Sequence, residues 1–167
     1  MSLTAIIDAT AAAVADDASR AGVTFKATGS STVISTTVRA RQHRFLVDEP
    51  ATLGGEDSAA NPVEYALGAL ASCQAITYRF WAAKLGVTVD EISIEAEGDL
   101  DVRGFFGLDD SVRPGFSAIR VTVSLSGPES AQRYQELQEA VERHCPVLDL
   151  FANPTPVTAQ LRINAPA

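Results

Sequence analysis

The fold of this chain depends above all on one apolar stretch, Asn61-Pro62-Val63-Glu64-Tyr65-Ala66-Leu67-Gly68-Ala69-Leu70-Ala71-Ser72-Cys73. It opens with a complete helix start. Asn61 can cap the helix, Pro62 suits the first helical position, and Glu64 can reach back in a capping box. We predict one helix over 62–85 whose first half has almost no polar face, so that it must be buried on all sides.

Length and composition show what can surround that helix. The chain has 167 residues, of which 46% are hydrophobic and 20% charged, which is typical of a globular protein rather than a disordered one. We predict a single domain over 1–167 with an α+β fold. A chain of this size rarely encloses a central helix alone, so we expect the helix to be wrapped by sheet or shared with a second subunit.

The charge balance excludes some partners. Lys and Arg number 13 and Asp and Glu number 21, giving a net charge of −8. This argues against binding to nucleic acid or to an anionic membrane. No segment resembles a membrane span or an export signal, because the Ala-rich N-terminus carries Asp8, Asp16 and Asp17 and no basic stretch. We expect a cytoplasmic protein.

The remaining elements follow from periodicity and turn residues. An N-terminal helix from Leu3 should end near Ala21, with Gly22 as a left-handed cap. Gly29-Ser30-Ser31 is typical of a turn. Alternating and β-branched residues predict antiparallel strands, and an amphipathic helix should end at His144. The predicted strands cover 23–27, 32–38, 42–47, 89–97, 116–125 and 157–163, and a short helix covers 147–151.

The chain has two cysteines, Cys73 and Cys145, too far apart for a C-x-x-C motif and too few for a four-cysteine metal site. Three interpretations stay open: two inert buried thiols, one structural disulfide, or a catalytic pair brought together by the fold. A permanent disulfide is uncommon in a reducing compartment, which favours free thiols or a transient disulfide.

The surroundings of Cys145 favour a role in chemistry. Pro146 suits the first position of helix 147–151, so we expect Cys145 at its N-cap, where the helix dipole favours the thiolate. The alternative is a buried residue before a kink. His144 could serve as the base of a cysteine hydrolase, but adjacent helical residues point in different directions and no orienting partner is recognisable.

A zinc site is a further hypothesis, built from the two cysteines with His43 and His144. None of the usual short ligand spacings is present. We therefore expect neither a metal nor a cofactor.

Four stretches together resemble the OsmC/Ohr family of osmotically inducible protein C and organic hydroperoxide resistance proteins. They are Asp48-Glu49-Pro50, Leu53-Gly54-Gly55, the stretch from Asn61 to Cys73, and Cys145-Pro146-Val147. Each is common alone, and the specificity lies in the combination. The resemblance runs from roughly Val33 to the C-terminus and leaves residues 3–22 outside it.

The resemblance implies a thiol-dependent peroxidase for organic hydroperoxides, with hydrogen peroxide as a second oxidant. It implies an intertwined homodimer in which an antiparallel β-sheet from both chains wraps two central helices. Cys73 would be the peroxidatic thiol, oxidised to a sulfenic acid, and Cys145 the resolving thiol. An external dithiol would reduce the resulting disulfide, whose formation needs the two Cα atoms within about 7 Å.

In this family an arginine oriented by a glutamate stabilises the attacking thiolate. Glu64 occupies the glutamate position, yet nine residues at about 100° each put it on the far side of the helix from Cys73. It acts either at the site, through an arginine or the second subunit, or only in the capping box. Among the strand arginines we select Arg39. Alternation puts it on one face with Arg41, and Arg44 on the other.

Two expectations concern apolar surface. Phe105 and Phe106 form either an apolar mouth that favours organic hydroperoxides or an exposed hairpin with one buried ring. The alternative function is a non-catalytic dimeric stress protein that binds a small hydrophobic ligand, with the cysteines incidental.

Overall fold

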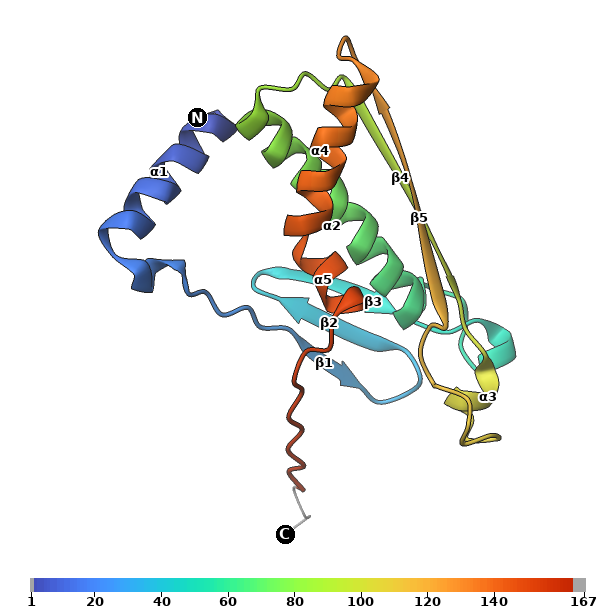
Figure 1. Cartoon of the computed structure of the whole chain (residues 1–167). Helices are drawn as coiled ribbons and strands as arrows, with labels where there is room; N and C mark the ends of the chain where they lie inside the picture. Colours follow the sequence, from blue (N-terminus) through green and yellow to red (C-terminus); the bar gives the residue numbers. More distant parts are fainter. Residues whose placement is uncertain (1, 164–167) are drawn as a thin grey trace.

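One long helix runs through the centre of an α+β fold in the computed structural model, which describes residues 2–163 (Figure 1). In chain order the elements are α1 (Leu3–Asp16), η1 (Ala18–Ala21), β1 (Thr28–Ser31), β2 (Thr36–Ala40), β3 (His43–Val47), η2 (Ala51–Leu53), α2 (Pro62–Leu85), β4 (Glu91–Asp99), α3 (Val102–Phe105), β5 (Ala118–Ser126), α4 (Ala131–His144) and α5 (Pro146–Ala152). The β4–β5 pair, α4 and α5 pack against α2, and β1, β2 and β3 form a separate antiparallel sheet. The predicted α+β class is confirmed.

Helix α2 has the predicted bounds because its local signals agree. The Asn61 side chain accepts a hydrogen bond from the Glu64 N–H at 2.9 Å, and the Glu64 carboxylate accepts one from the Asn61 N–H at 2.8 Å. This is the predicted capping box, which satisfies two of the orphan donors at the helix start. At the other end Gly86 adopts the left-handed conformation, with φ 64°, that stops a helix.

Only one face of α2 is buried within the chain. Its buried side chains are Leu70, Gln74, Thr77, Tyr78 and Ala82. Ile76 and Phe80 remain 59% and 37% exposed. The prediction of burial on all sides is therefore wrong for the single chain, because a two-stranded sheet and two helices cover one face and leave the other apolar face open.

The hydrophobic core lies where α2 meets α4 and the β4–β5 pair. Its buried members are Tyr78, Ala82, Val87, Val89, Leu137, Val141 and Cys145. Alternation in β4 and β5 sends Ile92, Ile94 and Val123 toward this cluster, as the period of two predicts. The core thus packs against one face of α2, and Cys73 lies on its border.

The N-terminal sheet differs from its prediction in two places. Residues 23–27, predicted as an alternating strand, form no strand and have no partner among the described residues before β1 begins. Residues 29–31, predicted as a turn, belong to β1, where Gly29 pairs with Val38 and Ser31 with Thr36. The chain reverses after Ser31 instead. Pairing with β2 outweighs the turn preference of Gly and Ser, because strand formation depends on the neighbouring strand as much as on local propensity.

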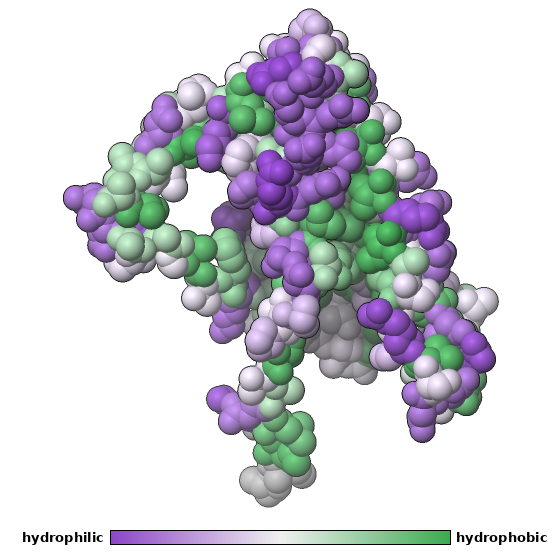
Figure 2. Space-filling model, viewed as in Figure 1, coloured by the Kyte–Doolittle hydropathy of each residue, from purple (hydrophilic) through white to green (hydrophobic). Residues whose placement is uncertain are grey.

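The predicted last strand is absent. Residues 157–163 form no ladder with any described strand, and Val157 and Ile163 are 88% and 80% exposed. The segment keeps its alternating pattern but has no partner strand in this chain, and it extends away from the body (Figure 1). Figure 2 shows hydrophobic residues left at the surface along this tail, while the outer face of α4 is largely hydrophilic.

Helix α1 is an arm on the outside of the molecule. It has no buried residue, and its apolar side chains meet α2 at Phe80, where they line a shallow hollow. The expected left-handed cap at Gly22 is wrong, since Gly22 has φ −78° and the helix already ends at Asp16. None of the helices in residues 2–163 has the length and apolar character that crossing a membrane requires.

Candidate functional site

The fold brings Cys73 and Cys145 together. Cys73 is a half-buried residue in the middle of α2, and Cys145 lies at the corner between α4 and α5, where it is 1% exposed. Both pack in the same hydrophobic cluster, both are free thiols, and Cys73 lies close enough to raise the pKa of the Cys145 thiol. Two thiols that are distant in sequence thus lie in contact without a bond between them.

The corner at Cys145 has the predicted geometry. Its N–H donates to the Val141 carbonyl at 2.9 Å and completes α4, while its carbonyl accepts from the Asp149 N–H at 3.0 Å and begins α5. Pro146 occupies the first helical position of α5. Cys145 is therefore the N-cap that the Cys-Pro sequence predicts.

The electrostatic expectation for Cys145 is wrong. Burial raises the pKa of its thiol, and the neighbouring Cys73 thiol raises it further. The Leu148 N–H at the start of α5 and the Thr77 hydroxyl act in the opposite direction but do not prevail. Desolvation of a thiolate in an apolar cluster outweighs the helix N-terminus, so Cys145 is held as the protonated thiol.

His144 is engaged away from the thiols. Its ring stacks on Trp81 with centroids 4.2 Å apart, and its Nδ1 lies 2.7 Å from the Ala140 carbonyl. This arrangement does not support the hydrolase hypothesis, in which His144 would face Cys145. Within residues 2–163 no three His, Cys, Asp or Glu side chains gather in a way that could hold a metal ion.

Glu64 and Arg39 are not brought to the cysteines within the chain. Glu64 is exposed, and its carboxylate is occupied by the capping box. Arg39 is exposed on β2, where it borders a surface hollow between residues 23–28 and 39–41. Neither side chain forms an ion pair with another described residue.

The predicted faces of the strand arginines also need correction. Arg41 lies in a tight hairpin turn with φ 55°, and β2 and β3 then pair Arg39 directly with Arg44. Directly opposed residues share a face, so Arg39 and Arg44 lie together. Simple alternation fails because the chain reverses direction at residues 41–42.

Phe105 and Phe106 do not cover the thiols. They lie at α3, where their rings meet edge to face with centroids 5.1 Å apart and remain 65% and 53% exposed. Both rings therefore lie outside at a short helix, and the buried ring of the exposed-hairpin alternative is not found.

Sequence reasoning missed an apolar cleft of about 550 Å³ between α2, the start of β5, and α5. It is lined by Val63, Ala66, Leu70, Arg113, Gly115, Phe116, Ser117, Ala118, Ile119, Val121, Leu148, Phe151 and Ala152. Arg113 is the only charged residue among the described residues that line it. Leu148, which also lines it, packs against the core cluster, and its backbone N–H lies at the Cys145 thiol. No local sequence pattern marks Arg113, because the cleft is assembled from three separate segments.

The chain is similar to one known protein family. The family model described as OsmC-like protein matches residues 55–160, more than half of the chain. No curated protein matches the chain.

Solved structures share its fold. An OsmC-like protein from Mycoplasma pneumoniae is 18% identical with a TM-score of 0.67, over 78% of this chain and 88% of the other. An organic hydroperoxide resistance protein OsmC from Legionella pneumophila is 18% identical with a TM-score of 0.61, over 77% and 89%. The organic hydroperoxide resistance protein OhrB of Bacillus subtilis is 21% identical with a TM-score of 0.53, over 77% and 90%. With the family match, these likenesses in fold lead to one assignment: the chain belongs to the OsmC-like family.

Proposed function

We propose that this chain is a thiol-dependent peroxidase that reduces organic hydroperoxides through Cys73 and Cys145. The observation that supports the proposal most is the contact between two free thiols in one apolar cluster. Structural relatives named organic hydroperoxide resistance proteins support the substrate class. In this proposal the half-buried Cys73 attacks and the buried Cys145 resolves.

Each step balances. The Cys73 thiolate attacks one peroxide oxygen, and the O–O bond breaks. The alkoxide leaves and takes a proton, which gives the alcohol. The hydroperoxide is thereby reduced, and Cys73 is oxidised to a sulfenic acid. The Cys145 sulfur then displaces the sulfenic hydroxyl, which leaves as water with the thiol proton, and an S–S bond forms. An external dithiol reduces that bond and becomes a disulfide itself.

The raised pKa of Cys145 suits the resolving role. A thiol that is protonated while Cys73 is reduced does not compete for the hydroperoxide, because the thiolate is the nucleophile. Cys145 then gives up its proton as it attacks the sulfenic acid. The contact between the two thiols then gives Cys145 immediate access to the sulfenic acid. The difference in burial between Cys73 and Cys145 supports an attacking and a resolving role rather than two equivalent roles.

The proposal includes a homodimer. The exposed apolar face of α2 at Ile76 and Phe80 needs a cover. Arg39 and Arg44 lie side by side on β2 and β3 without an acidic partner among the described residues. We propose that this sheet packs on α2 of a second copy and that Arg39 stabilises the thiolate at the partner subunit's Cys73.

The direct test is consumption of cumene hydroperoxide with a dithiol reductant. Cys73→Ser should lose the activity entirely. Cys145→Ser should still consume one equivalent, and its sulfenic acid should be trapped by dimedone. Activity in Cys73→Ser equal to that of the wild type would contradict the proposal.

Intact-mass measurement separates the peroxidase from the alternative, a non-catalytic protein that binds a small hydrophobic ligand. After one equivalent of hydroperoxide, the wild type should lose two hydrogens as the disulfide forms. An unchanged mass would favour the binding protein.

A further inference from the structure

A second hollow, of about 460 Å³, lies where the middle of α2 meets β5 and the corner between α4 and α5. Val121, Leu148 and Ala152 give it apolar walls, and Gln74 lines it from α2. The other lining residues are polar or charged, namely Glu142, Arg143, Asp149 and Asn153. The hollow therefore combines apolar walls with a polar residue from α2 and a charged rim.

Gln74 is a buried amide without a hydrogen-bond partner among the described residues. The residue is only 5% exposed. The hydroxyls of Ser72 and Thr77, its neighbours on α2, each donate to a carbonyl of the helix, but the Gln74 amide makes no such bond. Within residues 2–163, Asp48 Oδ1 is the only buried side-chain nitrogen or oxygen that is fully enclosed without a partner, so the Gln74 amide is reached from the hollow. A ligand that supplies a hydrogen bond there removes the cost of burying this amide unpaired.

Two carboxylates at the exposed rim of the hollow lack a basic partner. Glu142 Oε1 accepts a hydrogen bond from the Gln138 amide at 2.8 Å. Asp149 Oδ1 accepts one from the Asn153 amide at 2.7 Å. Neither carboxylate forms an ion pair with any residue in 2–163. Each therefore keeps its negative charge without a cation and has one oxygen free for a ligand.

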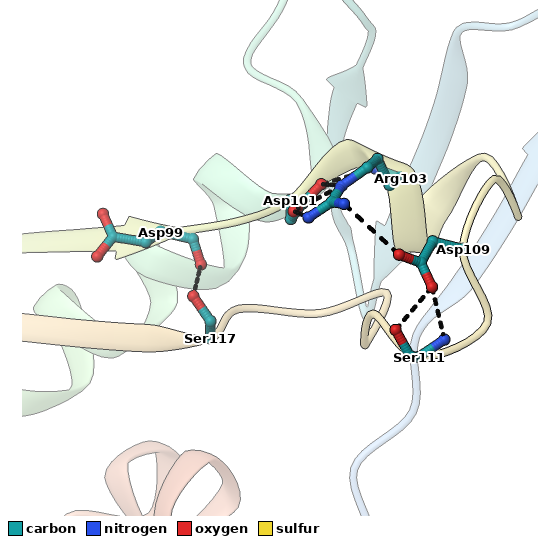
Figure 3. Close-up of polar contacts among 6 residues, drawn as sticks. All are labelled: Asp99, Asp101, Arg103, Asp109, Ser111 and Ser117. Atoms are coloured by element: carbon teal, nitrogen blue, oxygen red, sulfur yellow. Dashed lines mark hydrogen bonds and ion pairs between the residues drawn. The ribbon is translucent and has the colours of Figure 1, made fainter.

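The acidic side chains around α3 show the contrast. Asp101 and Asp109 both bind Arg103, at 2.6 and 3.5 Å, so their charges are balanced within the chain (Figure 3). At the hollow the only cation among the described lining residues is Arg143, and it pairs with Glu139 at 3.7 Å. The hollow thus retains an excess of negative charge, which is complementary to a cationic group.

The charge of Glu142 also acts on the buried face of α2. Tyr78 lies one helical turn after Gln74 on this face. Burial and, as a smaller contribution, the Glu142 carboxylate raise the pKa of Tyr78 to about 12. Glu142 is therefore close enough to α2 to act on a cation that reaches Gln74.

We propose that the hollow binds a primary ammonium group on an apolar stem, with the ammonium paired to Glu142 and Asp149 and donating one N–H to the Gln74 carbonyl. An ammonium carries three donors and no acceptor, so it satisfies one oxygen on each of three separate elements. A guanidinium fits less well, because its planar fork suits two oxygens of one carboxylate. The stem lies against the apolar walls. This site is separate from the thiols and does not depend on the proposed peroxidase function.

Calorimetry with hexylamine near neutral pH tests the assignment. The full-length wild type should bind it, and Glu142→Gln and Gln74→Met should each bind it about tenfold more weakly. Glu136→Gln is the matched control, since it removes an equal charge from an exposed position of α4 outside the hollow and should keep the wild-type affinity. No binding by the wild type, an unchanged affinity in Glu142→Gln, or an equal loss in Glu136→Gln would overturn the assignment.

Two analogues of hexylamine separate charge from hydrogen bonding. Hexanol keeps the stem without the charge, and trimethylhexylammonium keeps the charge without an N–H donor. Both should bind at least about tenfold more weakly than hexylamine. Trimethylhexylammonium that binds as tightly as hexylamine would contradict the hydrogen bond to Gln74.

The stability of Gln74→Met distinguishes a ligand site from a structural role. Without amine, this variant should keep or raise the urea midpoint, because the folded chain loses no hydrogen bond and no longer buries an unpaired amide. A lower midpoint with unchanged hexylamine affinity would show that the amide serves the fold, and would overturn its role in the site. Glu142→Gln, at the exposed rim, keeps the test decisive if Gln74→Met fails to fold.

The source of the ammonium is either a free alkylamine or the lysine side chain of a protein. N-acetyl-lysine amide, which presents that side chain on a capped backbone, distinguishes them. Affinity equal to that of hexylamine would identify a lysine side chain, and a much lower affinity would identify a free amine. Binding of neither compound would overturn the ammonium site.

Discussion

Residues 2–47 and residues 62–152 are held in place by different means. In the first region Val47 is the only buried residue among those described, although a helix and three strands are present. The second region contains the entire core cluster. Both regions therefore form regular helices and strands, but only residues 62–152 have a hydrophobic core.

The first region meets the second in two places, because α1 packs on α2 near Phe80 and the sheet joins α2 at one edge. The Tyr65 hydroxyl of α2 donates to the Leu46 carbonyl at 2.7 Å, and the Phe45 and Tyr65 rings lie 4.9 Å apart. A three-stranded sheet with both faces open has little stability of its own. Strand pairing therefore defines the N-terminal sheet, whereas its stability must come from another surface, which is the role we assign to the second copy.

The largest expected effect lies in the second region. Leu137 is fully buried between α4 and α2, so Leu137→Ala should lower the free energy of unfolding by about 3 kcal/mol. Leu108→Ala is the matched control, because Leu108 is 73% exposed and should cost less than about 0.5 kcal/mol. Urea unfolding measures both. Equal costs would mean that the core is not centred on α4.

The next effect concerns the open face of α2. Ile76→Arg places a charge on the apolar surface that the proposed dimer covers, and should raise the dimer dissociation constant about a hundredfold. Sedimentation measures the constant, and circular dichroism checks that the fold is retained. Ser72→Arg, at an exposed polar position of the same helix, reports the effect of charge alone. A wild type that is monomeric at all concentrations would refute the dimer.

The same two regions explain how much the sequence could predict. Helix α2 was predicted to its end residues because its cap, its first proline and its final glycine are local signals. The meeting of Cys73 and Cys145 was foreseen through the family resemblance. These features depend on residues near in sequence or on a pattern that the resemblance supplies.

Features that depend on distant segments were missed. The strand at 28–31 forms through pairing with β2, and the shared face of Arg39 and Arg44 follows from the hairpin at Arg41. The raised pKa of Cys145 arises from side chains of α2 and α4 around it. The apolar cleft forms only when three separate segments meet. Local patterns carry no information about such contacts.

A smaller effect tests the role of Glu64 at the start of the second region. Glu64→Ala removes one half of the capping box and should cost about 1 kcal/mol, whereas Glu64→Gln keeps an acceptor and should cost only a few tenths. Thermal unfolding measures both. If Glu64→Gln keeps its stability but loses peroxidase activity, Glu64 also acts at the site and the purely structural interpretation is wrong.

The smallest effect appears only in acid, at the junction of the two regions. Buried Asp48 follows β3, and its Oδ2 accepts hydrogen bonds from the Glu56 N–H at 3.1 Å and from the Ser58 N–H and hydroxyl at 3.0 and 2.7 Å. The Ser58 hydrogen bonds, with those from the Glu49 and Glu56 backbone, lower the pKa of Asp48 from 3.8 to about 2 against the opposing effect of burial. The folded state therefore binds this proton less readily than the unfolded state.

The sign of the pH dependence follows from that difference. A group whose pKa is lowered on folding stabilises the protein above its unfolded pKa, near 3.8, and loses that contribution as the pH falls toward 2. Asp48→Asn should be less stable than the wild type at pH 6, and the gap between them should close between pH 4 and pH 2. Urea midpoints across this range measure the gap, and Asp110→Asn, at an exposed position of the loop before β5, controls for a lost surface charge. A gap that stays constant down to pH 2 would show that the Asp48 carboxylate does not link β3 to the start of α2 through its charge.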